Sequence, residues 1–218
     1  MGLLSARAAG AILGAALAAV LPAAAGAEGP AFGLRLGWAT SLGDAADHLP
    51  LSEEVAWLAP VQADALWTFA PSGRIAAGAY ASWGPGRGGT AACADGAACS
   101  AQAIRAGAQG LWTFYRWRPG SGAWVGAGAG WEWTSVRRER LGAATTTRWN
   151  GPELSIQGGA AWRLGEAFAI GPFAQLGVGR YAGVTVETPV ETASAPIADR
   201  RVHAWAELGV RATFDVEL

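Results

Sequence analysis

The residues that most often carry catalysis are scarce in this sequence, which has only two histidines. His203 and Glu207 share one face of an alternating segment, but a separation of four residues along an extended chain spans more than about 13 Å, too far for a direct hydrogen bond. His48 stands in the segment GDAADHLP, which we expect to be a loop. The sequence also lacks a phosphate-binding loop, zinc-ligand spacing and a dinucleotide fingerprint. We therefore predict no catalytic residue, no bound metal and no cofactor.

Charged residues on the polar face of the predicted strands indicate ion pairing inside the fold instead. Arg105 and Glu132 stand almost equally far from the turn near residues 118–119, which places them on neighbouring strands at one height. Charges removed from water must be paired, so we predict a network of salt bridges in which this pair is the first candidate. The predicted network comprises Arg35, Asp64, Arg105, Glu132, Glu153, Arg163, Glu207 and Arg211.

The segment that must position the last of these residues is RVHAWAELGVRATFDVEL, residues 201–218. Every even position from Val202 to Leu218 is apolar, whereas the odd positions hold most of the charged and polar residues. Side chains alternate between the two faces of a β-strand, so this pattern predicts one long strand with an apolar and a polar face.

The same alternation extends over most of the chain. It predicts eight strands, at about residues 31–41, 55–69, 74–84, 102–115, 123–135, 152–164, 167–181 and 201–218. Short turns near residues 71, 119 and 166 alternate with longer segments at 42–54, 85–101, 136–151 and 182–200. An even number of strands with short turns on one side and longer loops on the other is typical of outer-membrane barrels. We predict an all-β fold, an eight-stranded antiparallel up-and-down transmembrane β-barrel.

The aromatic residues favour a barrel whose apolar face meets lipid. Tryptophans and phenylalanines of the apolar parity cluster toward both ends of the predicted strands, as at the two interfaces of a membrane. The chain has 32 Gly, only 15% charged residues and no lysine, a composition ill suited to dissolving an exported domain. A soluble exported β-barrel or sandwich is the alternative. The near-neutral net charge of −1 gives no indication of nucleic-acid binding.

The first residues have the features of a secretory signal: one arginine, an apolar run from about residue 8 to 21, and a small-residue end at Ala25-Gly26-Ala27. The apolar run is too short for a spanning helix. We assign residues 1–27 to a signal peptide and residues 28–218 to the barrel. Export to an oxidising compartment favours a disulfide between Cys93 and Cys99, with free thiols or a metal site as the alternative.

The signal peptide, the eight alternating strands and the terminal apolar strand together resemble the small outer-membrane barrel family typified by the OmpA transmembrane domain and OmpX. The terminal residues Gly209, Phe214, Val216 and Leu218 are similar to the signal read by the barrel-assembly machinery, although such chains commonly end in Phe. The resemblance implies a monomeric barrel in the outer membrane of a Gram-negative bacterium. It also implies contact with outer-membrane lipids and a structural, envelope-integrity or surface-contact role.

An eight-stranded barrel has room for little more than its own side chains, so we expect the ion pairs to plug the lumen. A narrow small-solute channel is the first alternative, and a lipid A-modifying enzyme is the second. A deacylase of that class looks for His-x-Ser, where this chain has His203-Ala204-Trp205. In the predicted loop SVRRERLGAATTTRWN, four arginines could contact lipopolysaccharide phosphates or simply be solvated. They are Arg137, Arg138, Arg140 and Arg148.

Overall fold

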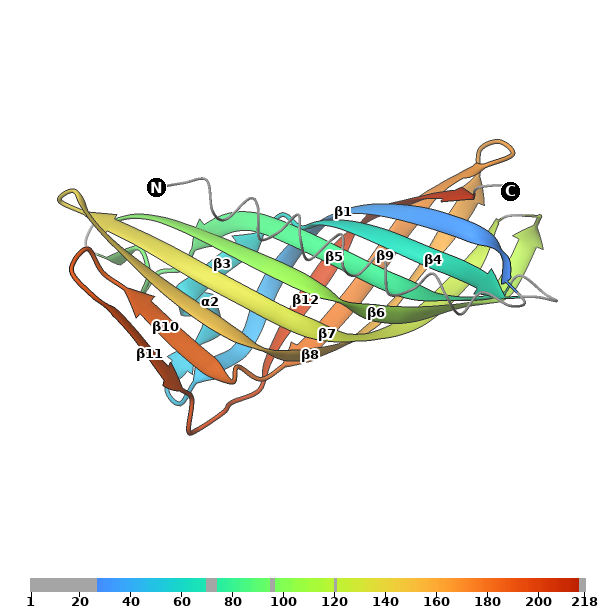
Figure 1. Cartoon of the computed structure of the whole chain (residues 1–218). Coiled ribbons are helices and arrows are strands. Elements are labelled where there is room, and N and C mark those ends of the chain that lie inside the picture. Colours follow the sequence, from blue (N-terminus) through green and yellow to red (C-terminus); the bar gives the residue numbers. More distant parts are fainter. Residues whose placement is uncertain (1–26, 70–73, 95–96, 120, 216–218) are drawn as a thin grey trace.

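The structure is a computed structural model that describes residues 27–69, 74–94, 97–119 and 121–215. Within these residues, eight antiparallel strand positions form a closed ring (Figure 1). The strand β1 (Ala27–Ala46) closes the ring by pairing with β12 (His203–Asp215) on one edge and with β4 (Val61–Phe69) on the other. The predicted all-β, eight-stranded barrel is confirmed. The remaining ring strands are β5 (Ile75–Gly88), β6 (Ala98–Arg118), β7 (Ser121–Arg140), β8 (Ala143–Arg163) and β9 (Phe168–Gly179).

The second strand of the ring is interrupted near its middle, where the sequence pattern predicts one continuous strand over 55–69. It consists of β3 (Val55–Leu58) and β4, separated by Ala59 and Pro60. Proline cannot donate a backbone hydrogen bond, so the regular ladder stops there. The wall stays closed because Pro60 O accepts from Gly37 N at 3.0 Å and Ala59 N donates to Pro85 O at 2.7 Å.

The third long connection, expected as a loop over 136–151, is instead a continuation of the barrel wall. The strands β7 and β8 extend to Arg140 and from Ala143, and only Leu141 and Gly142 lie between them. Their φ angles are 51° and 80°, the left-handed conformation of a tight hairpin turn. The prediction was wrong because this part of the hairpin lies beyond the apolar band, where a strand needs no alternation of apolar and polar residues.

The end of the barrel that carries the longer connections, here called the long-loop end, holds further structure. The first connection contains β2 (Leu49–Pro50) and the short helix α2 (Leu51–Glu54), and the last contains the hairpin of β10 (Gly183–Glu187) and β11 (Thr192–Pro196). Strand β10 pairs with residues 146–150 of β8, on the edge that β9 occupies further along, and β11 pairs with β10, so the hairpin lengthens the wall at this end (Figure 1). The opposite end is called the short-turn end.

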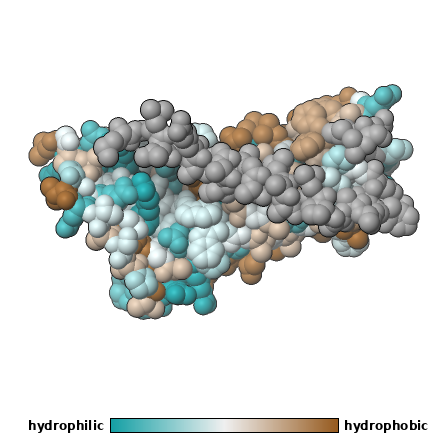
Figure 2. All heavy atoms as spheres, in the orientation of Figure 1, coloured by the Kyte–Doolittle hydropathy of each residue, from teal (hydrophilic) through white to brown (hydrophobic). Residues whose placement is uncertain are grey.

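The outside of the ring is covered by apolar side chains. Leu36, Leu154 and Leu208 are each more than half exposed on this outer face. Figure 2 shows hydrophilic side chains gathering at the long-loop end, with brown apolar ones further along the wall. Within the described residues no helix has the length and apolar character to cross a membrane. Exposed aromatic rings lie toward the short-turn end at Phe32, Phe69, Trp112, Phe114 and Phe214, and toward the long-loop end at Trp38, Trp83, Trp131 and Trp133.

The inside of the ring contains two apolar clusters with a polar layer between them. One cluster, near the short-turn end, consists of Leu66, Leu111, Trp124 and Phe173. The other fills the long-loop end, where Leu51 and Ile197 from the connections pack with Val55 and other residues of the wall. The charged residues that the sequence assigns to the lumen lie mainly between these clusters, and they form the site described next.

Candidate functional site

Arg35 on β1 is the centre of a polar network in the barrel, and only 1% of its surface is exposed. Its Nε donates to Asp64 Oδ2 on β4 at 3.1 Å, and its Nη2 donates to Gln109 Oε1 on β6 at 3.0 Å. Its Nη1 donates to the side-chain oxygens of Gln157 on β8 and Gln175 on β9. One guanidinium therefore connects β1 to strands on every side of the ring.

A second guanidinium, that of Arg211 on β12, shares the carboxylate of Asp64. Arg211 Nε lies 3.3 Å from Asp64 Oδ2, and Gln62 Nε2 donates to Asp64 Oδ1 at 2.8 Å. The guanidinium carbons of Arg211 and Arg35 lie 5.1 and 5.8 Å from the ring centre of Trp124. Aromatic rings favour such positive neighbours, so Trp124 supports both cations from the short-turn side of the network.

A separate group of charges surrounds Arg105 on β6, which is also buried. Its Nε lies 3.2 Å from Glu153 Oε2 on β8, and its Nη1 lies 3.8 Å from Glu207 Oε2 on β12. The guanidinium carbon lies 5.0 Å from the ring centre of Trp205. This group, like the Arg35 group, joins strands that are not neighbours in the ring.

Glu132 on β7 is a buried carboxylate that accepts mostly from neutral donors. The hydroxyl of Tyr181 donates to Glu132 Oε1 at 2.8 Å, and Trp205 Nε1 donates to the same oxygen at 2.9 Å. Thr134 also donates to Oε1, while His203 Nε2 lies 3.1 Å from Oε2. His203 stacks on Tyr181 with ring centres 3.9 Å apart, so the aromatic rings hold the donors in place.

The predicted direct pair of Arg105 with Glu132 differs from the observed geometry. The two residues are opposite each other in the register of β6 and β7, as their spacing from the turn indicates. The ion pairs of Arg105 nevertheless reach across the lumen to Glu153 and Glu207. Glu132 already accepts from three neutral donors and faces His203, so its oxygens are occupied without a guanidinium.

Arg163, the remaining predicted member, lies outside the central network. It is at the short-turn end of β8, where its guanidinium donates to the backbone oxygen of Glu166. A count of the predicted members leaves three guanidiniums in the centre against four carboxylates.

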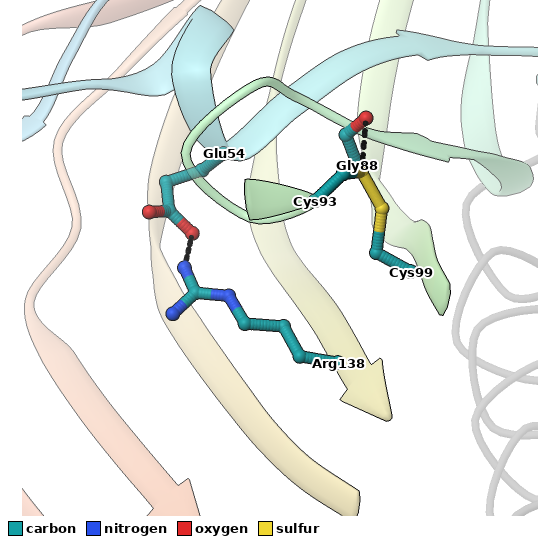
Figure 3. The surroundings of a disulfide bond; sticks show 5 residues. All are labelled: Glu54, Gly88, Cys93, Cys99 and Arg138. Carbon is teal, nitrogen blue, oxygen red and sulfur yellow. Dashed lines mark hydrogen bonds and ion pairs between the residues drawn. A yellow bond between two sulfur atoms is a disulfide. The ribbon is translucent and has the colours of Figure 1, made fainter. Parts of the chain in front are cut away.

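The long-loop end of the lumen is closed by apolar side chains and by a loop that contains a disulfide bond. The structure contains the disulfide between Cys93 and Cys99, with Cα atoms 5.5 Å apart, and Cys93 Sγ lies 3.1 Å from Gly88 O (Figure 3). Beside it, the buried Glu54 of α2 forms an ion pair with Arg138 of β7 (Figure 3). The loop also bonds to α2 through Gly89 N and Glu54 O at 2.8 Å, so the connections hold one another across the mouth.

The four arginines predicted for lipopolysaccharide contact lie on the β7–β8 hairpin, not on a loop, and they do not share one environment. Arg138 is half-buried and turns inward to Glu54. Arg137 and Arg148 are exposed and have carboxylate neighbours: Arg137 Nη2 lies 3.3 Å from Glu139 Oε2, and Arg148 Nη1 lies 2.8 Å from Glu187 Oε1. Arg140 is exposed next to the turn.

The predicted assembly signal is only partly described. Gly209 lies opposite Gly37 on β1 and Phe173 on β9. Phe214 is exposed on the outer face, with its ring centre 5.0 Å from that of Phe168. Val216 and Leu218 lie outside the described residues, as does most of the predicted signal peptide, since the described residues begin at Ala27.

Sequence reasoning missed the neutral partners of the charged groups. Gln109, Gln157 and Gln175 hold Arg35, and Tyr181 and Trp205 hold Glu132. Their inward parity was a usable signal for the glutamines, because each alternates with apolar residues on its strand. In the described part of the chain, no group of three or more His, Cys, Asp or Glu side chains is placed to hold a metal ion. The arrangement braces and fills the barrel.

Comparison with protein-family models gives no match, and no curated protein sequence is significantly similar. Solved structures with the same fold do exist. Neisserial surface protein A aligns with a TM-score of 0.50 and 10% identity over 88% of this chain and 99% of that one. A major outer-membrane protein of Thermus thermophilus aligns with a TM-score of 0.55 and 14% identity over 85% of this chain and 99% of that one. The outer-membrane protein AlkL aligns with a TM-score of 0.51 and 12% identity over 90% of this chain and 94% of that one. The chain therefore has the fold of the small outer-membrane β-barrel proteins.

Proposed function

We propose that this chain is an outer-membrane barrel that serves a structural and surface-contact role and does not conduct solutes. The closed ring satisfies its backbone hydrogen bonds between strands, which a structure in lipid requires. Its outer face presents exposed leucines such as Leu36 and Leu208 between two groups of aromatic rings. Both features support a location in the outer membrane, with the short-turn end toward the periplasm.

The observation that carries the proposal is the filling of the lumen at successive levels. The Arg35 group spans the ring near the middle, and the Arg105 and Glu132 groups span it nearer the long-loop end. Leu51 and Val55 then close the mouth with an apolar cluster, and both are fully buried. Ions and polar solutes would have to break buried ion pairs and cross apolar packing, so this lumen favours a closed barrel over a channel.

The exposed hairpins support a role in contact. The strand β11 pairs with β10 along one edge, and all of its residues from Thr192 to Pro196 are exposed. Arg137 lies on β7 four residues beyond the exposed Trp133 and has the same parity, so both residues belong to the outer face. Phosphate groups of lipopolysaccharide would lie at this height, and arginine suits phosphate through its planar set of donors.

The contact can be measured by binding of refolded protein to a surface coated with lipopolysaccharide. We expect the double variant Arg137→Gln/Arg148→Gln to bind more weakly than the parent. The control is Arg118→Gln, which removes an exposed charge at the short-turn end and should bind like the parent. Equal binding by all three proteins would remove the lipopolysaccharide contact from the proposal, and equal loss in both variants would reduce it to net charge.

A further inference from the structure

The short-turn end of the lumen contains a cavity of about 170 Å³ that adjoins the Arg35 network at Arg211 and Trp124. Its inner part is apolar and closed, because Leu66, Leu111 and Trp124 line it and each is buried. Its outer part is accessible, since Arg74 and Arg116 also line it and both are exposed. The cavity, here called the vestibule, therefore opens toward the short-turn side.

The vestibule collects arginines from four different parts of the ring. Arg74 precedes β5, Arg116 is on β6, Arg163 is at the end of β8 and Arg211 is on β12. None of the described residues that line the vestibule is acidic. Converging positive charge on low-dielectric walls attracts and concentrates anions.

Neutral donors reinforce this chemistry. Thr68, Thr113, Ser121 and Thr213 also line the vestibule, and each carries a hydroxyl group. Arg211 also faces Asp64 at 3.3 Å deeper in the lumen, so its position is fixed by a buried carboxylate. The lining of the vestibule thus combines guanidinium groups, hydroxyl groups and a buried apolar floor.

We propose that the vestibule binds a small solute carrying a phosphate monoester, with the phosphate among the rim arginines and a compact apolar or ring-shaped body on the floor. A phosphate monoester has three terminal oxygens, which can accept from several guanidiniums and hydroxyls at once, whereas a carboxylate has two. The apolar floor of Leu66, Leu111 and Trp124 would bury the body of the ligand. The same headgroup chemistry occurs in soluble esters and in phosphatidic acid.

Isothermal titration calorimetry on the refolded full chain in dodecyl maltoside tests the proposal, because this detergent carries no phosphate. The probes are phenyl phosphate, inorganic phosphate, dihexanoyl phosphatidic acid and, as a neutral comparison, phenol. We expect saturable binding of one phenyl phosphate per barrel, weaker binding of inorganic phosphate and none of phenol. Tighter binding of the phosphatidic acid than of phenyl phosphate would identify the source as lipid, and the reverse would identify a soluble ester.

Matched double variants locate the site. Arg74→Gln/Arg163→Gln should weaken binding of phenyl phosphate about tenfold or more, since each charge-assisted hydrogen bond to phosphate is worth that order of affinity. Arg87→Gln/Arg180→Gln removes the same charge at two exposed residues of the long-loop end that belong to neither proposed phosphate contact, and it should bind like the parent. Folding of each protein is certified by separate migration of its unheated and boiled gel bands. If the first double variant does not fold, the single variant Arg74→Gln, at an exposed residue before β5, replaces it.

Two results would overturn the proposal: no saturable heat with the parent, or equal weakening in both double variants. Binding in detergent does not depend on the lipopolysaccharide contact or on the closed lumen, so the vestibule can fail or succeed independently of the proposed function.

Discussion

Arg105 and Glu132 lie directly opposite each other on β6 and β7, yet the ion pairs of Arg105 reach past this neighbour to Glu153 and Glu207. A guanidinium has five N–H donors in a fixed plane, so it can engage carboxylates on different strands. The pairs connect β6 to β8 and to β12, neither of which is hydrogen-bonded to β6 in the ring. These contacts brace the barrel across its lumen in addition to the bonds between neighbouring strands.

Reversing the charge of this brace should destabilise the fold. The change Arg105→Glu would place a fourth carboxylate among Glu132, Glu153 and Glu207, and breaking a buried ion pair typically costs about 3–5 kcal/mol. We expect the midpoint of urea unfolding in lipid vesicles to fall. The control Arg148→Gln breaks an exposed pair with Glu187 and should unfold like the parent. An Arg105→Glu barrel as stable as the parent would show that the ion pairs of Arg105 do not contribute to the stability of the fold.

Glu132 offers a second test, because its partners are chiefly neutral donors. The change Glu132→Gln keeps an oxygen that can accept from Trp205 and Tyr181, and it leaves three carboxylates to face three central guanidiniums. We expect only a small loss of stability. Glu132→Ala leaves the buried donors without an acceptor and should cost about 1–3 kcal/mol more than the glutamine variant. Urea unfolding measures the loss of stability in both variants. An equal loss in the free energy of unfolding would contradict the hydrogen bonds assigned to Glu132.

The outward orientation of Leu208 can be tested with a pair of identical substitutions. Leu208→Arg places a charge in the middle of the apolar outer face, where an arginine costs about 2–4 kcal/mol in a membrane barrel. Leu141→Arg makes the same change at the tip of the β7–β8 hairpin, where the leucine is 99% exposed and beyond the apolar band. Unfolding from lipid vesicles should be easier for the first variant only. Equal stability of both variants would mean that the assigned outer face does not meet lipid.

The disulfide should matter locally. Replacing both Cys93 and Cys99 by Ser removes a bond that closes a short loop, which costs at most about 2 kcal/mol of unfolding free energy in the loop-entropy description. We expect the variant to keep its unheated gel band, since the ring strands pair without the loop. Proteinase K should cut the variant between residues 89 and 98 faster than the parent, and the parent treated with a reductant should behave like the variant. Unchanged cleavage would show that the loop is held by its contacts with α2 alone.

The wall of the barrel could be predicted from the sequence because lipid enforces the alternation. In the last strand, a shift of one residue would turn Glu207 and Arg211 toward the lipid side, so the sequence must alternate strictly. The wall is less predictable beyond the apolar band, where a charged side chain on the outer face costs little. The polar residues around Arg140 read as a loop but form a hairpin, since strands outside the apolar band have water on their faces. At Pro60 the error is the opposite one: the alternation of residues predicts one continuous strand, but the strand is interrupted there.

The composition of the lumen was predictable, and its pairing was not. The alternation of side chains along each strand is enough to assign Arg35, Asp64 and Arg105 to the inner face of the barrel. Pairing depends on how far a long side chain reaches across the ring, which the register of neighbouring strands does not give. The glutamines that hold Arg35 carry no charge, so a search for ion partners overlooks them. Arg163 shares the inward parity but lies at the short-turn end, where the vestibule begins.

Planar-bilayer conductance tests the central claim, a lumen closed by its own side chains, most directly. The sample is protein refolded in detergent whose unheated gel band migrates apart from the boiled one. The closed lumen predicts a silent bilayer for the parent at all voltages that the bilayer withstands. Discrete current steps from the folded parent, changed in size by Arg105→Ala or Glu153→Gln, would mean that solutes pass the central network and that the barrel is a channel.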